Sequence, residues 1–197
     1  MSFRLGVGMA AALIAIGALA PGAVRASPDD MFEYLSGGAP PGKSPYSLLM
    51  LNLPRRTTVN FPGNHKPGTV VINTAERRLY FVNGDGTAIR YGIGVGRVGF
   101  TWKGVRHVTE KKEWPDWTPP EQMLKRRPDL PRFMKGGEDN PLGARAMYLG
   151  GTLYRIHGSN EPETIGQPVS SGCFRLTNED VKDLYDRVKV GALVIVQ

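Results

Sequence analysis

Glycine and proline constrain the fold of this chain more than any other feature, with 25 glycines and 16 prolines among 197 residues. Proline lacks a backbone donor and glycine favours turns, so this density excludes a bundle of long helices and favours turn-rich β structure. The apolar share of 41% is ordinary for a globular protein and excludes disorder over the whole chain.

The first 26 residues have the layout of a secretory signal peptide. Arg4 provides a positive start, an uncharged apolar run follows, and Val24-Arg25-Ala26 offers a cleavage site. We therefore expect residues 1–26 to be removed, leaving an exported, periplasmic protein that begins at Ser27. The alternative is an uncleaved membrane anchor, because the run from Leu5 contains about 20 uncharged residues, enough to span a bilayer.

The net charge of +7 is expected to attract anionic polymers such as nucleic acid, acidic lipid or bacterial wall. Nucleic acid is excluded as a partner because the chain is exported and lacks aromatic residues at the spacing that stacks bases. Residues 27–66 show little pattern and contain repeated glycine and proline, which indicates an N-terminal arm or linker. Residues 67–197 are expected to form one mostly β domain.

This domain shows strand patterns with one late helix. Asn83-Gly84-Asp85-Gly86 predicts a hairpin turn, and Thr177 is placed to cap a helix over residues 178–188. Between residues 121 and 143 we expect one short helix at most, within a long loop. Strands are predicted over residues 69–73, 78–82, 87–95, 103–112, 144–149, 152–157 and 192–196.

The single cysteine, Cys173, excludes an internal disulfide and a multi-cysteine zinc site. It follows Ser170, Ser171 and Gly172, and a helix begins soon after Arg175, so a nearby cation and helix terminus can favour its thiolate. The backbone N–H groups of Ser171, Gly172 and Cys173 can point at a developing oxyanion. This order indicates acyl transfer, whereas the alternative for Cys173 is a buried small hydrophobic residue.

A thiol nucleophile needs a base, and the chain offers His65, His107 and His157. His157 is the best candidate because it ends an apolar strand, a rigid position, and precedes Cys173 through a turn-rich loop. The alternative is a hydrogen-bonded core histidine. The three histidines are too scattered to predict a zinc site, so no metal is expected.

Several segments together resemble the YkuD-type L,D-transpeptidases, the cysteine enzymes that cross-link bacterial peptidoglycan. The resemblance covers roughly residues 68–197 and rests on these segments: Gly94-Val95-Gly96-Arg97, Glu113-Trp114-Pro115-Asp116-Trp117-Thr118-Pro119-Pro120, Asn140-Pro141-Leu142-Gly143, Tyr148-Leu149-Gly150-Gly151, Ile156-His157-Gly158-Ser159-Asn160-Glu161-Pro162, Ile165-Gly166 and residues 169–180. It implies a β-sandwich-like domain without metal or organic cofactor. Cys173 would be the nucleophile, His157 the general base, and Gly158 or Ser159 the group that orients the imidazole.

The resemblance also implies the reaction. The thiolate would attack the diaminopimelate–D-Ala bond of a stem tetrapeptide, release D-Ala, and pass the acyl group to a diaminopimelate amine or to the amine of an outer-membrane or wall-anchored protein. Water as the acceptor would make the enzyme an L,D-carboxypeptidase, and a non-catalytic wall-binding module is the third alternative.

Around the thiol, Ser170, Ser171 and Gly172 would form the oxyanion and substrate site, joined by Tyr154 and Arg175. Many family members have histidine where this chain has Ser171, but His157 matches the family's base. For Tyr154 the alternative is a core position. For Arg175 it is a structural ion pair with Glu179 or Asp180.

Overall fold

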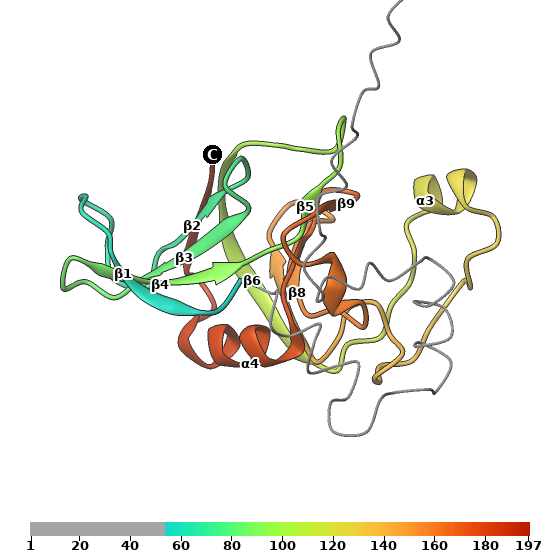
Figure 1. Cartoon of the computed structure of the whole chain (residues 1–197). Coiled ribbons are helices and arrows are strands. Elements are labelled where there is room, and N and C mark those ends of the chain that lie inside the picture. Colours follow the sequence, from blue (N-terminus) through green and yellow to red (C-terminus); the bar gives the residue numbers. More distant parts are fainter. Residues whose placement is uncertain (1–53) are drawn as a thin grey trace, which may run out of the picture. The chain divides into compact units, whose positions relative to one another are not determined.

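A continuous sheet dominates residues 54–197, the part of the chain that the computed structural model describes (Figure 1). Its strand order is β1-β4-β3-β2-β11-β6-β7-β8-β10, and a second, two-stranded sheet pairs β5 with β9. The elements are β1 Thr57–Asn60, β2 Val70–Asn73, β3 Arg78–Val82, β4 Thr87–Gly92, β5 Val95–Gly96, β6 Gly104–Glu113, α3 Glu121–Arg126, β7 Arg145–Leu149, β8 Arg155–His157, η1 Pro162–Thr164, β9 Pro168–Ser170, β10 Phe174–Arg175, α4 Asn178–Arg187 and β11 Leu193–Val196.

Strand β6 joins the two halves of the long sheet. Its first residues pair with β11, its last pair with β7, and the register shifts between Val108 and Glu110. A bulge of this kind bends a strand, so β6 serves both halves. The two halves share one hydrophobic core, which includes Val70, Ile72, Leu79 and Tyr91 from one half and Met147, Leu149, Ile156 and Phe174 from the other. The expectation of a mainly β domain is therefore confirmed.

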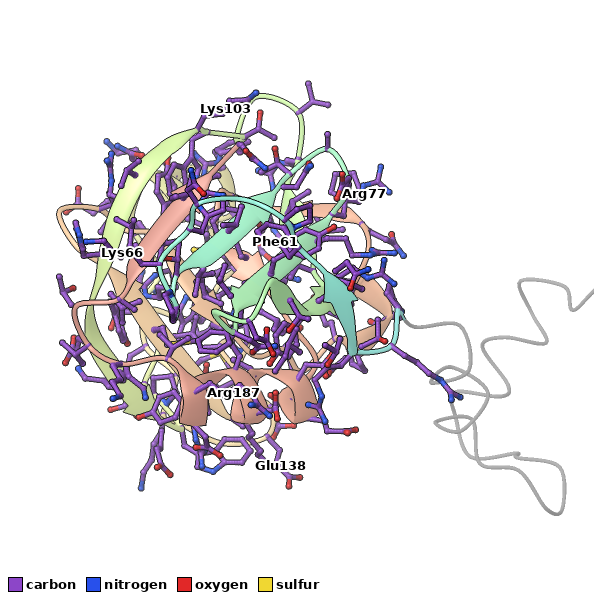
Figure 2. All side chains as sticks on the ribbon, turned by 90° about the vertical axis from the view of Figure 1, so that its left-hand side faces the viewer. Phe61, Lys66, Arg77, Lys103, Glu138 and Arg187 are labelled. Atoms are coloured by element: carbon purple, nitrogen blue, oxygen red, sulfur yellow. The ribbon has the colours of Figure 1, made fainter. Side chains whose placement is uncertain are left out.

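The late helix α4 forms where the sequence predicts it. Thr177 Oγ1 accepts a hydrogen bond from the Asp180 N–H at 3.1 Å, which caps the helix, and Val181 and Leu184 are buried in the core. On its outer side Arg187, labelled in Figure 2, pairs with Asp183 one turn earlier at 2.9 Å. Through its buried residues the helix packs against β7 and covers the core there.

Part of the segment expected to be a linker is a strand. Within residues 27–66, β1 pairs antiparallel with β4, with Thr58 opposite Ile89, and Arg56 pairs with Asp180 of α4 at 3.3 Å. Val59 is the only apolar residue in β1, so the sequence there lacks the hydrophobic alternation that would predict a strand. The expected signal peptide and the rest of the arm lie outside the described residues. From residue 54 onward no helix has the length and apolarity to span a membrane.

The long loop after β6 is closed at its base. Trp117 and Met134 exchange two backbone hydrogen bonds of 2.8 Å, and α3 is the single short helix between them, as predicted. At the end of α3 the Arg126 guanidinium lies 5.0 Å from the centre of the Phe100 ring. The loop is therefore anchored both at its base and against the segment between β5 and β6.

Candidate active site

The parallel pair β8–β10 brings the predicted nucleophile and base to one face of the sheet. Ile156 lies opposite Phe174 and His157 opposite Arg175, and both Ile156 and Phe174 point into the core. Side chains alternate along a strand, so His157 and Cys173, which directly precedes β10, share the other face. Their separation in the chain is taken up by the segment that carries η1 and β9.

The imidazole of His157 is buried and held in one orientation. Its Nδ1 lies 2.6 Å from the carbonyl oxygen of Gly158, so Nδ1–H donates and the lone pair is left on Nε2. Burial, with the Arg175 charge as the next cause, lowers the pKa of His157 to about 3. At neutral pH the ring is therefore uncharged and can accept a proton at Nε2.

Of the two residues expected to orient the imidazole, Gly158 is the one placed on Nδ1. A side chain at Gly158 would collide with Asn178 Oδ1, which accepts a hydrogen bond from Ala144 N at 2.8 Å. The Ser159 hydroxyl instead accepts from Glu161 N at 3.0 Å and so shapes the following loop.

The Asn-Pro-Leu-Gly motif packs against the backbone that follows His157. Asn140 Oδ1 accepts from Leu142 N at 2.9 Å, and Gly143 adopts φ +61° directly against the backbone of Gly158 and Ser159. A larger residue at position 143 would meet the Ser159 nitrogen at 2.5 Å, which explains why glycine is needed there.

Cys173 is half-buried. The thiol donates to the carbonyl oxygen of Leu153 at 3.8 Å. Burial raises the pKa of Cys173, while the charge of Arg155 acts in the opposite direction. The thiol and the imidazole are therefore both uncharged at neutral pH.

Ser170 organises the turn that ends at the thiol. Its hydroxyl donates to the Cys173 carbonyl oxygen at 2.6 Å and accepts from Gly172 N at 3.1 Å. This corrects one expectation, because the Gly172 N–H is used inside the turn and does not point at an oxyanion. Of the three donors expected from the sequence, the N–H groups of Ser171 and Cys173 stay candidates for the oxyanion site.

Tyr154 packs against the same turn. Gly172 has φ +111°, and a side chain there would meet the Tyr154 ring at 2.5 Å. Tyr154 stacks on Trp102 with ring centres 4.7 Å apart, and Trp102 Nε1–H donates to the Gly172 carbonyl oxygen at 2.9 Å. Sequence analysis missed Trp102, because it lies in an irregular segment between β5 and β6 with no motif of its own.

Arg175 forms an ion pair with Glu161 at 2.9 Å, and not with Glu179 or Asp180, the pairing that was the alternative to a substrate contact. The reason is the register of β10, which turns Arg175 toward His157 and the loop after it. Glu179 and Asp180 pair with Arg56 instead, at 3.8 and 3.3 Å.

Among the described residues, neither a metal-ligand cluster nor the surface hollow at the end of β6 adds a residue to the predicted site. No cluster of three or more His, Cys, Asp or Glu side chains between residues 54 and 197 is arranged to hold a metal ion. A surface hollow of about 550 Å³ lies at the end of β6, on the other side of β7 from β8. Its lining contains none of the predicted site residues and consists of Lys111, Lys112, Glu113, Trp114, Pro115, Asp116, Tyr148 and Tyr185.

Similarity to known proteins covers the part of the chain that carries this site. The sequence model of the L,D-transpeptidase catalytic domain, YkuD, matches residues 67–196. Two proteins of Escherichia coli K12, Probable L,D-transpeptidase ErfK/SrfK and Probable L,D-transpeptidase YbiS, are each 40% identical over 159 residues. These matches cover 76% of this chain and 49% and 50% of the two proteins, so the chain spans about half the length of these curated relatives.

A solved structure shares the fold. It is the crystal structure of L,D-transpeptidase 3 from Mycobacterium tuberculosis in complex with a faropenem-derived adduct, with a TM-score of 0.53 and 20% identity. The match covers 66% of this chain and 59% of that chain. At this identity the likeness supports the β architecture alone.

Proposed function

Because the chain belongs to the family of L,D-transpeptidase catalytic domains, we propose that it transfers acyl groups between peptidoglycan stem peptides, with Cys173 as nucleophile and His157 as general base. One observation carries the assignment of roles. A neutral imidazole with Nε2 available stands on the same sheet face as the only cysteine, on neighbouring strands.

Acylation begins when the Cys173 thiol passes its proton to His157 Nε2. The thiolate attacks the carbonyl carbon at the L-centre of diaminopimelate in a stem tetrapeptide, and the backbone N–H groups of Ser171 and Cys173 stabilise the oxyanion. A low imidazole pKa makes the protonated ring a strong acid, so it readily protonates the leaving nitrogen of D-Ala. A thioester on Cys173 remains.

The acceptor completes the cycle. Attack by the side-chain amine of a second diaminopimelate, with His157 taking the proton, joins two stem peptides. A protein amine would anchor that protein to the wall, and water would release a tripeptide, which is the L,D-carboxypeptidase alternative.

A penem probe tests the nucleophile directly, since the Mycobacterium tuberculosis relative is described with a faropenem-derived adduct. We expect one faropenem adduct on Cys173 of the purified chain by intact mass and peptide mapping. The adduct should be absent in Cys173→Ala and form at least about a hundredfold more slowly in His157→Gln. A wild-type chain that stays unlabelled would contradict the assignment and favour the non-catalytic wall-binding module.

Muropeptide analysis of cells with and without the gene separates the acceptors. Lost dimers joined through two diaminopimelates support the cross-linking reaction, lost tripeptides support the carboxypeptidase, and lost wall-bound protein supports anchoring. We place the reaction in the periplasm, following the expected signal peptide. A secreted product whose N-terminus is Ser27 would support that location, whereas a product that retains residues 1–26 would favour the membrane anchor.

A further inference from the structure

We propose that the guanidinium of Arg155 is the counter-ion of the Cys173 thiolate and therefore a catalytic residue that touches the reacting sulfur. The proposal rests on the proposed function in one respect, that Cys173 is the nucleophile. The motifs around His157 and Cys173 give no reason to single out Arg155, which sequence analysis treated as part of an apolar strand.

The sheet brings Arg155 and Cys173 together. Continuing the parallel register of β8 and β10 by one step places Arg155 beside Cys173, on the face opposite Ile156 and Phe174. Both side chains also converge on one acceptor: Arg155 Nη1 donates to the Leu153 carbonyl oxygen at 3.1 Å, and the Cys173 thiol donates to the same oxygen at 3.8 Å.

Arg155 is held in this position from its other side. Its Cζ lies 5.2 Å from the centre of the Tyr148 ring, a cation–π arrangement that fixes the plane of the guanidinium against β7. Its Nε is buried without a hydrogen-bond partner in the structure. A buried unpaired donor is unfavourable, and an anion formed next to it relieves that cost.

The positive charge of Arg155 is also uncompensated. None of the ion pairs found between residues 54 and 197 includes Arg155. Arg175, the other guanidinium near the site, is already paired with Glu161 at 2.9 Å. The charge free to balance an anionic sulfur is therefore that of Arg155.

The titratable and charged groups that face the sulfur are few, and they explain why a second cation is needed. They are Arg155 and His157 from β8 and Arg175 from β10. Burial, followed by the charges of Arg175 and Arg155, lowers the pKa of His157 to about 3, so the imidazolium is a short-lived partner for the thiolate. Burial raises the pKa of Cys173, and the charge of Arg155 opposes that rise.

The step balances without any further reactant. The S–H bond of Cys173 breaks, its proton forms an N–H bond at His157 Nε2, and the electron pair stays on sulfur. The Arg155 charge stabilises the thiolate until the sulfur bonds to the carbonyl carbon, and only after that does the proton pass from His157 to the leaving nitrogen.

The test uses the fact that the chain has a single cysteine, so alkylation by iodoacetamide reports on Cys173 alone. We would measure the alkylation rate of the folded chain against pH for wild type, Arg155→Met and Arg155→Lys. Removing the charge should raise the midpoint of the rate profile by about one pH unit or more and slow the reaction at pH 7 about tenfold. Arg155→Lys should stay close to wild type.

Arg145→Met is the matched control. Arg145 also has a buried unpaired Nε, but it pairs with Glu113 at 3.0 Å and lies against Tyr185, away from the thiol. We expect its midpoint to equal that of wild type. Arg155→Gln serves as a second charge-removing variant if Arg155→Met does not fold, as judged by circular dichroism.

Two results would overturn the proposal: an unchanged midpoint in the folded variants that lack the charge, or a shift in Arg155→Lys as large as in Arg155→Met. Because alkylation needs no peptidoglycan, this outcome is independent of the proposed function. If the Arg155 variants shift the alkylation midpoint as expected but the chain transfers no acyl group, the proposed function is contradicted. The assignment of Arg155 as the counter-ion of the thiolate then still holds.

Discussion

Replacing Ser170 by alanine should loosen the turn that presents the thiol and destabilise the whole domain. The Ser170 hydroxyl is buried and makes two hydrogen bonds, to the Cys173 carbonyl at 2.6 Å and from Gly172 N at 3.1 Å. Each bond contributes about 1 kcal/mol net, and the substitution also leaves a buried donor and acceptor without this partner. We therefore expect the free energy of unfolding to fall by about 2–4 kcal/mol.

Urea unfolding followed by tryptophan fluorescence measures this loss, and the same samples give the rate of faropenem acylation. Ser171→Ala is the matched control, since its half-buried hydroxyl takes no part in the two bonds, and its unfolding free energy should stay within about 0.5 kcal/mol of wild type. If Ser170→Ala were equally close to wild type, or if Ser171→Ala were the more damaging change, the assignment of Ser170 as the residue that holds this turn would be refuted.

Two further outcomes follow from the site. Folding lowers the pKa of His157 from about 6.5 to about 3, so between these pH values the unfolded chain binds one more proton than the folded chain. The free energy of unfolding should therefore fall as pH decreases through this range, by up to about 4–5 kcal/mol. Asp180, whose pKa is raised to about 6, changes stability with pH in the opposite direction. The measurement is therefore the difference in urea midpoint between wild type and His157→Gln at each pH. A difference that does not change with pH would contradict the prediction. Trp102→Phe keeps the stacking on Tyr154 but loses the bond to the Gly172 carbonyl, and it should cost about 1 kcal/mol in thermal unfolding, whereas an unchanged Tm would argue against that bond.

Local patterns in the sequence were enough for much of the fold. The hairpin around Asn83-Gly84-Asp85-Gly86 and the helix capped by Thr177 form as predicted, because turn chemistry and capping act between residues close in the chain. The final strand was predicted by its apolar run, but its position was not. β11 lies between β2 and β6 in the sheet, and such pairing depends on contacts between distant segments.

The site divides along the same line. His157 and Cys173 carry motifs, and the sequence was sufficient to single them out. Three other contacts arise from strand register and from an irregular loop. They are the ion pair of Arg175, the contact of Trp102 with Gly172, and the approach of Arg155 to the thiol. No periodicity encodes these contacts. The Gly172 N–H was misassigned for a related reason, since one serine side chain decides where a backbone donor points.

Trapping the covalent intermediate on the natural type of donor tests the central claim most directly. The purified chain would be mixed with a diaminopimelate-containing stem tetrapeptide, quenched in acid after short times, and analysed by intact mass and peptide mapping. We expect a transient adduct on Cys173 with the mass of the donor less D-Ala, absent in Cys173→Ala and slowed at least about a hundredfold in His157→Gln. Release of D-Ala by Cys173→Ala at the wild-type rate would contradict the claim.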